Sequence, residues 1–423
     1  MSRRLIALLL LSFAALTACG RVGATQPAAA GYRIFLEEGF NGGSERITVR
    51  DSSSGALERV LPLGTPAPDW SRYYTVTPMA GSARLTAIDP SSGRTIAQAT
   101  VPTGYWLPSL GYQGPTAGLS PNGQWLALTD NGSAMTGKLV TSFLVGPSSL
   151  SGAFKTVRVD GDFSFDALSS TGQSLYLIQK MGDPNHYQVR LLDVSSGTLV
   201  EQPVVDKRDA AEPMNGIRGD SVADPTAQYV FTVYAREAGP FIHALPLDQP
   251  FAWCIDLPAK SASDLEEQFH WSLAFNHNGS LLYAVNSSSG RIAEISPASL
   301  PSAGRTAQLA LNSGRSLLAG FVTEADAKGA RIGGATVSAD GRTLFALGNT
   351  GILAIDTATL KVRARILEGE SVDSLRLSTD GQWLYAAGAA TSKVWQINPS
   401  TGAVSGEVAG ATNPWALLWA APK

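Results

Sequence analysis

Residues 119–128 read LSPNGQWLAL, and six further stretches of the 423-residue chain follow the same order. Each has a short start, a polar turn and then an apolar strand that contains aromatic residues. Asn-Gly and Asp-Gly turns accept positive φ and match the twist of two antiparallel strands, so each stretch predicts a β-hairpin. The other six are LSSTGQSLYLI (168–178), FNHNGSLLYAV (275–285), VSADGRTLFAL (337–347), LSTDGQWLYAA (377–387), ADPTAQYVFTV (223–233) and APDWSRYYTV (67–76).

The spacing of these turns indicates one repeated unit. The turn positions 70, 123, 172, 227, 279, 341 and 381 have a mean spacing of about 52 residues. A second turn follows four of the hairpins, in AIDPSSGRT (87–95), LLDVSSGTL (191–199), AIDTATLKV (354–362) and QINPSTGAV (396–404). Each unit then has four strands, and the strands after the hairpins are apolar on consecutive positions, as in strands buried on both faces. This pattern predicts an all-β propeller. A β-sandwich of unrelated hairpins is the alternative.

The two ends of the chain complement each other. Residues 413–420 (NPWALLWA) look like a first strand without a hairpin partner. Residues 32–62 supply the three missing strands in YRIFLEE, RITVRDSSSG and ALERVLP. Joined, these segments make one more blade, which leaves no free sheet edge between the first and last blades. We therefore expect eight blades, with seven as the alternative if one irregular unit is not a blade.

These units resemble the YVTN and WD-like β-propeller repeats of bacterial surface and periplasmic proteins. Residues 282–286 (LYAVN) are closest to the strand after which the YVTN repeat is named. The departures are Ala227 in place of glycine, the pair Asp69 and Trp70, and a long insertion from Leu300 to Arg331. The resemblance implies a fold and a habit of binding, and it transfers no catalytic residue.

The first twenty residues, MSRRLIALLLLSFAALTACG, predict a secretory signal because two arginines precede a short apolar run and then small residues. The segment resembles a bacterial lipoprotein signal whose lipobox is Leu16, Thr17, Ala18 and Cys19. That resemblance implies a signal peptide at residues 1–18, a lipidated tether at 19–31 and a single propeller domain at 32–423. The protein would then be exported and lipid-anchored to the outer membrane or to the outer face of the cytoplasmic membrane. An ordinary signal peptide or a membrane anchor is the alternative.

Composition narrows the class of partner. Hydrophobic residues make up 44% of the chain, which excludes a disordered protein. The formal net charge is −3, so there is no basic excess to neutralise the phosphates of a nucleic acid. Cleavage before a lipidated Cys19 would leave Cys254 as the single remaining thiol, so we expect no intramolecular disulfide.

The sequence contains no recognisable catalytic or metal-binding motif. HExxH, GxSxG and Walker patterns are absent, and the four histidines lack the spacing of metal ligands. We interpret SASDLEEQFH (261–270) as a short surface helix capped by Ser263, and not as an acid/base carboxylate pair. Asp89, Asp193 and Asp356 are expected to bond the backbone of their own turns. We therefore predict no catalytic residue, no metal and no cofactor.

The expected interaction surface is the face opposite the two kinds of turn. It carries the connections between blades and the loops between second and third strands. Its predicted binding residues are Tyr105, Trp106, Tyr112, His186, Arg208, Arg218, Arg236 and His270. The alternative for the three aromatic residues is that they cap the edge of a blade.

Two functions are compatible with these observations. The first is a membrane-anchored, exported binding or scaffold module for a protein, a peptide or an envelope polymer. The alternative is a propeller enzyme, either a lactonase-like hydrolase or a quinone-dependent dehydrogenase. AIDPSSGRT and QINPSTGAV resemble the turns of quinoprotein blades, but no tryptophan follows them at a regular offset.

Overall fold

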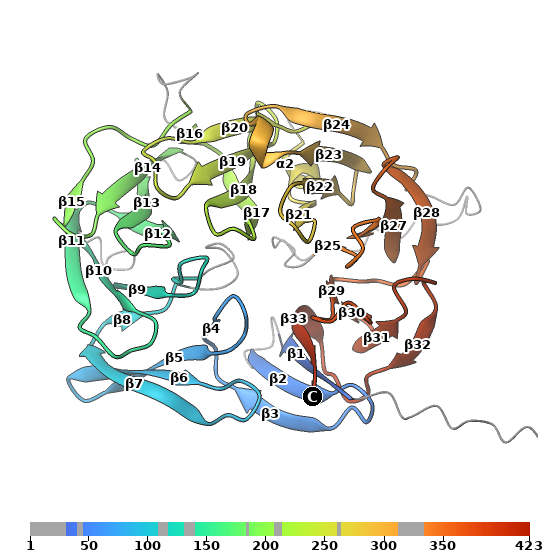
Figure 1. Cartoon of the computed structure of the whole chain (residues 1–423), viewed down its shortest axis with the longest axis horizontal. Coiled ribbons are helices and arrows are strands. Elements are labelled where there is room, and N and C mark those ends of the chain that lie inside the picture. Colours follow the sequence, from blue (N-terminus) through green and yellow to red (C-terminus); the bar gives the residue numbers. More distant parts are fainter. Residues whose placement is uncertain are drawn as a thin grey trace, which may run out of the picture. The chain divides into compact units, whose positions relative to one another are not determined.

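The chain folds as a ring of β-sheets. The structure is a computed structural model that describes residues 31–39, 45–108, 117–130, 140–182, 186–206, 214–259, 264–311 and 334–423. Gly31–Lys423 form one compact unit, and its strands make eight sheets that follow one another around the ring (Figure 1). The chain is therefore an all-β propeller with eight four-stranded blades, as predicted. Within the described residues, no helix has the length and hydropathy of a membrane span.

Blades 2 to 4 follow each other along the chain, and each is numbered here from its innermost strand outward. Blade 2 contains β4 (Thr65–Pro66), β5 (Tyr73–Met79), β6 (Ser82–Ile88) and β7 (Thr95–Pro102). Blade 3 contains β8 (Tyr105–Trp106), β9 (Trp125–Asp130), β10 (Val140–Pro147) and β11 (Lys155–Asp160). Blade 4 contains β12 (Phe163–Leu168), β13 (Ser174–Lys180), β14 (His186–Asp193) and β15 (Thr198–Leu199), and a short β16 (Met214–Asn215) also pairs with β14.

Blades 5 to 8 continue around the ring. Blade 5 contains β17 (Ile217–Ala223), β18 (Tyr229–Ala235), β19 (Phe241–Pro246) and β20 (Trp253–Asp256). Blade 6 contains β21 (Trp271–Phe275), β22 (Leu282–Asn286), β23 (Arg291–Ile295) and β24 (Ala303–Gln308). Blade 7 contains β25 (Ala335–Val337), β26 (Thr343–Leu347), β27 (Ile352–Asp356) and β28 (Lys361–Ile366). Blade 8 contains β29 (Ser374–Leu377), β30 (Leu384–Gly388), β31 (Lys393–Ile397) and β32 (Val404–Glu407).

Blade 1 is built from both ends of the chain. Its sheet order is β33 (Pro414–Pro422), β1 (Tyr32–Glu38), β2 (Arg46–Asp51) and β3 (Leu57–Leu61). β33 pairs antiparallel with β1, with Leu417 opposite Leu36. Lys423 also forms ion pairs with Asp51 and Glu58, so the last residue is tied to the N-terminal strands. This arrangement confirms the predicted composite blade and the count of eight.

The predicted hairpin turns share one backbone conformation. The repeated glycine has a φ between 69° and 72° at Gly123, Gly172, Gly279, Gly341 and Gly381. Trp70 and Ala227, which replace glycine in two copies, hold φ values of 55° and 59°. Side chains rarely adopt this left-handed region, so these two residues keep the turn at some cost in strain. The two departures therefore belong to genuine repeats.

A side chain at the start of six of these turns locks the hairpin. Ser120 Oγ accepts a hydrogen bond from the backbone N–H of Trp125 at 3.0 Å, and Ser378 Oγ does the same for Trp383 at 3.0 Å. The equivalent pairs are Ser169 with Ser174, Asp224 with Tyr229, Asn276 with Leu281 and Ser338 with Thr343. Each bond spans five residues, so the hairpin is encoded within its own sequence.

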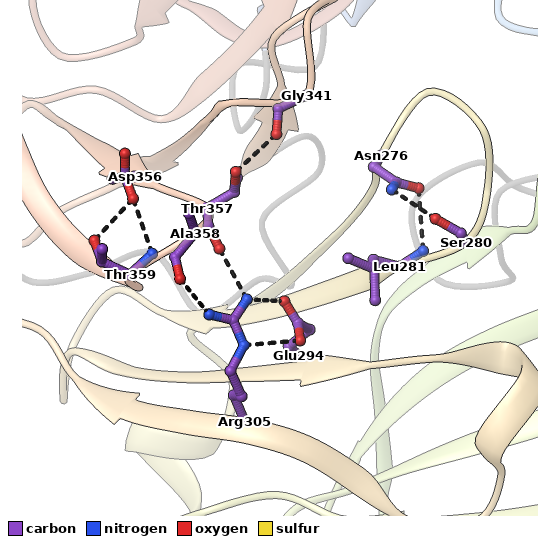
Figure 2. A network of polar contacts seen from close by, with 10 residues as sticks. All are labelled: Asn276, Ser280, Leu281, Glu294, Arg305, Gly341, Asp356, Thr357, Ala358 and Thr359. Atoms are coloured by element: carbon purple, nitrogen blue, oxygen red, sulfur yellow. Dashed lines mark hydrogen bonds and ion pairs between the residues drawn. The ribbon is translucent and has the colours of Figure 1, made fainter.

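The second kind of turn lies on the same side of the molecule as the hairpins. In Figure 2 the Thr357 Oγ1 donates to the carbonyl of Gly341 at 2.8 Å, which joins the two kinds of turn in blade 7. Asp356 accepts from the backbone N–H of Thr359 at 2.8 Å, as expected for an Asx-type turn. Arg305 of β24 pairs with Glu294 and donates to the Thr357 carbonyl at 2.9 Å, which connects blade 6 to blade 7.

The Asp residues of these turns bond their own backbone, as the sequence predicts. At Asp193, hydrogen bonds from the Ser195 hydroxyl and then from the Ser196 backbone N–H lower the pKa to about 2. The carboxylate form is therefore held by the turn. Asp89 likewise accepts from the backbone N–H of Ser91 at 2.8 Å.

The core lies between blades. The described residues form eight apolar clusters, and each cluster combines side chains from two neighbouring blades. In blade 6, for example, Leu282 packs toward blade 5 and Tyr283 toward blade 7. This alternation explains why the second strand of a blade is apolar at every position.

The region between blades 6 and 7 differs from the expectation. An insertion was predicted from Leu300 to Arg331, but Ala303–Gln308 form β24, the fourth strand of blade 6. β24 is mostly exposed because it is the outermost strand, so it lacks the apolar pattern by which the inner strands were recognised. Residues 312–333 lie outside the described part of the chain.

The composite blade yields a test of ring closure. Leu417 in β33 is fully buried, whereas Val404 in the outermost strand of blade 8 is 46% exposed. We expect Leu417→Ala to lower the free energy of unfolding by about 2–5 kcal/mol and Val404→Ala to change it by less than about 1 kcal/mol. Urea titration of both variants measures the difference. Equal losses would show that β33 does not close the core.

Glu37 of β1 is an acid buried beside another acid. It is 8% exposed, and burial, followed by the charge of Glu45, raises its pKa to about 7. The folded chain therefore binds a proton more tightly than the unfolded chain between about pH 4.5 and pH 7. The contribution of Glu37 to stability is present below this window and is lost as the pH rises through it.

Replacing Glu37 by Gln removes this titration. We expect Glu37→Gln to raise the free energy of unfolding at pH 8, by about 3 kcal/mol at most, and to have little effect at pH 4.5. Denaturant unfolding of both proteins at the two pH values measures this. An effect of the same size at both pH values would contradict the assignment.

Candidate functional site

The two faces of the ring differ in what they carry. Because neighbouring strands in a blade are antiparallel, the hairpins and the Asx-type turns lie on one face, called here the hairpin face. The opposite face, called the loop face, carries the connections between blades and the loops between second and third strands. In blades 5 and 6 these are the loop after β18, the connection from β20 to β21 and the loop after β22.

A short helix organises the loop face between blades 5 and 6. Helix α2 (Leu265–Gln268) begins at Asp264, whose side chain accepts from the backbone N–H of Glu267 at 3.1 Å. The predicted cap at Ser263 is therefore wrong. A carboxylate one residue closer to the helix satisfies the same donor. The short helix itself is confirmed.

Hydrogen bonds hold α2 against both blades. Gln268 accepts from the backbone N–H of Arg236 at 2.8 Å and donates to its carbonyl at 3.0 Å, which fixes the helix to blade 5. Asn286 of blade 6 donates to the carbonyl of Glu267 at 2.8 Å. Ser287 donates its backbone N–H to the carbonyl of His270 at 3.1 Å. The segment from 264 to 270 is thus preorganised by its main chain.

This segment forms one wall of a pocket of about 520 Å³. The α2 side contributes Asp264, Glu266, Glu267 and His270, and blade 6 contributes Arg291 and Gln308, together with two serines. A volume of this size suits a small organic ligand or one side chain of a larger partner. His270 is the one sequence-predicted binding residue that lines it.

Glu267 is the unsatisfied group of this pocket. It is 5% exposed, and neither carboxylate oxygen has a hydrogen-bond partner among the described residues. Buried polar atoms almost always have a partner, and leaving a buried charge unpaired costs several kcal/mol. Sequence reasoning missed Glu267 because it read the acidic stretch as a solvated helix. Its position directly before a buried first strand, beside His270, was the available signal.

The pocket on the hairpin face is different in character. It measures about 560 Å³ and lies between blades 2 and 3. Asn122, which lines it, accepts from Ser120 Oγ at 2.7 Å and from the Gln124 N–H at 3.1 Å, and donates to the Ser170 carbonyl at 2.9 Å. The amide of Asn122 is therefore already used by the turns, in contrast to the carboxylate of Glu267.

The other predicted binding residues do not join one site. Trp106 is 39% exposed, but Tyr105 is 8% exposed and packs between blades 2 and 3, which corrects its assignment as a contact residue. His186 is exposed at the start of β14. Tyr112, Arg208 and the proposed lipidation site Cys19 lie outside the described residues.

Two predicted arginines serve the packing of the blades. Arg218 of β17 pairs with Asp166 of β12 at 3.1 Å, and its side chain is 10% exposed, so it joins blades 4 and 5. Arg236 stacks over the ring of Phe241 at 4.3 Å and pairs with Asp256 at 3.2 Å. Both residues do lie toward the loop face, but their charged groups are directed to neighbours within the fold.

Further charged residues on the innermost strands have structural contacts as well. Asp220 of β17 accepts from the backbone N–H of Leu273 in blade 6 at 2.7 Å, and burial raises its pKa to about 7. Arg376 of β29 donates to the carbonyl of Leu417 in blade 1 at 3.2 Å. These side chains bind the inner edge of a neighbouring blade. Among the residues that the structure describes, no three His, Cys, Asp or Glu side chains are placed to hold a metal ion.

Comparison with known proteins gives the fold. No protein-family model matches the sequence, and neither does any curated protein. The structure is similar to that of apo AztD from Citrobacter koseri, with 11% identity and a TM-score of 0.55 over 93% of this chain and 98% of that chain. It is also similar to NirN, a dihydro-heme d1 dehydrogenase solved with DHE, with 14% identity and a TM-score of 0.52 over 92% of this chain and 74% of that chain. At such identities the similarity shows that this chain shares their fold, and nothing more.

Proposed function

We propose that the protein is an exported, lipid-anchored propeller that binds an envelope protein, peptide or polymer on its loop face. The observation that carries the proposal is the preorganised pocket beside α2 with the buried, unpartnered carboxylate of Glu267. A polar group left unsatisfied within a rigid frame is suited to a partner that arrives from outside. Binding needs only the charges and the shape that the lining residues supply.

The proposed address rests on the resemblance of Leu16–Cys19 to a lipobox. Lipid chains on Cys19 would hold the protein at a membrane, since two or more acyl chains anchor stably. Residues 20–31, treated as a flexible coil, would reach about 20 Å from the lipid. An anchored binding module gains effective concentration toward partners on the same surface.

Metabolic labelling tests the anchor. A bacterial culture that expresses the full-length chain is supplied with radiolabelled palmitate. We expect the wild-type chain and Cys254→Ser to take up label and Cys19→Ser to take up none, because Cys254 lies in β20 and not in the lipobox. Label on Cys19→Ser, or none on the wild type, would show that the N-terminus is not a lipoprotein signal.

Site-specific photo-crosslinking tests the binding face. A photoreactive amino acid is placed at Ser288, which is exposed at the pocket on the loop face, or at Ser149, which is exposed at the pocket on the hairpin face. We expect adducts with envelope components to form several-fold more at Ser288 and to disappear when excess unlabelled chain is added. Equal labelling at the two positions, or more at Ser149, would contradict a binding site on the loop face.

A further inference from the structure

The pocket beside α2 carries an excess of negative charge. Asp264, Glu266 and Glu267 contribute three carboxylates, and Arg291 is the one guanidinium among the described residues that line it. An anion entering this pocket would meet more repulsion than attraction, and a cation the reverse. Because the pocket is partly enclosed by protein, salt screens these interactions less than it does on an open surface.

The groups already present do not neutralise Glu267. The side chain of Asp264 is engaged with the backbone N–H of Glu267 itself, at 3.1 Å. Arg291 has an unpartnered Nε, and neither oxygen of Glu267 accepts a hydrogen bond within the described structure. A charged acceptor and the space beside it are therefore both available to a donor from another molecule.

We propose that this pocket binds an organic cation whose N–H groups donate to the Glu267 carboxylate. This deepens, and rests on, the proposed binding function. The chemistry is that of a primary ammonium or guanidinium on an aliphatic stem, supplied either by a free polyamine or by a Lys or Arg side chain of a partner. Hydrogen bonds to a charged acceptor are about twice as strong as neutral ones. A cation without N–H groups cannot make them.

Several features distinguish this ligand from a bare metal ion. The lining carboxylates are not gathered around one point, since no cluster of three ligands exists in the described residues. The pocket of about 520 Å³ leaves room for a stem as well as a charged head. Glu267 and Glu266 lie on opposite terms with solvent, the first buried and the second exposed, which suits a ligand that extends from the interior to the rim.

Titration calorimetry of the detergent-solubilised full-length chain tests the proposal. The probes are 1,5-diaminopentane, agmatine and choline, the last of which has the same charge type but no N–H donor. We expect the first two to bind and choline to bind at least about tenfold more weakly. Equal affinity for all three would overturn the proposal, because it would reduce the site to unspecific attraction. Absence of binding by both amines would overturn it as well.

A matched pair of variants locates the acceptor. Glu267→Gln is expected to weaken amine binding at least about tenfold, whereas Glu368→Gln, which removes an exposed charge from the connection between blades 7 and 8, leaves it unchanged. Without ligand, Glu267→Gln should unfold at the same temperature as the wild type or higher, because it removes an unpaired buried charge. Equal amine affinity of Glu267→Gln and the wild type would overturn the role of Glu267.

A second variant keeps the test independent of Glu267. Arg291→Gln removes the guanidinium of the pocket and should strengthen binding of 1,5-diaminopentane several-fold. Weaker binding by Arg291→Gln would mean that the pocket holds an anionic group, which contradicts the proposal. The source of the cation is resolved with spermidine and with a short lysine peptide and its Nε-acetylated form.

Failure of this inference is separable from failure of the binding function. Crosslinking at Ser288 without amine binding would retain the loop-face partner and reject the cation. Amine binding without crosslinking to the envelope would retain the cation and reject a macromolecular partner at this face.

Discussion

Burial of both faces of every blade is the constraint on which the rest of the structure depends. The apolar clusters all lie between neighbouring blades, so a single blade has no core of its own. Any end of the array would expose an apolar face, and closing the ring removes both ends at once. The pairing of β33 with β1 does this, with Leu417 opposite Leu36 at the centre of the contact. The eight-bladed circle follows from that requirement.

A closed ring also divides the molecule into a face that is complete and a face that is not. On the hairpin face, the polar groups of the turns are satisfied by short-range bonds such as Ser120 with Trp125 and Thr357 with Gly341. On the loop face, the backbone of α2 is fixed by Gln268 and Asn286, but the carboxylate of Glu267 has no described partner. Rigid support beside an unsatisfied charge is the arrangement expected of a binding site and not of a stability element.

The fold could be predicted in detail because its signals are local. The hairpin bonds span five residues and the Asx-type turns fewer, so each copy of the pattern encodes its own geometry. Even the departures at Trp70 and Ala227 keep the positive φ of the repeat. The expectation failed where the signal was weak. β24 is exposed and polar, so it was read as part of an insertion, and Asp264 replaced Ser263 as the cap of α2.

The sequence by itself determined the repeated blade, the hairpin chemistry and the complementary ends, because periodicity, turn residues and apolar runs are properties of neighbouring residues. Only the tertiary structure decided which charged groups are satisfied. Arg218 turns to Asp166 of the next blade, Tyr105 is buried between blades, and Glu267 is left unpaired beside Arg291. Such outcomes depend on how blades distant along the chain pack together, and burial and pairing across those contacts set the energy of a charge.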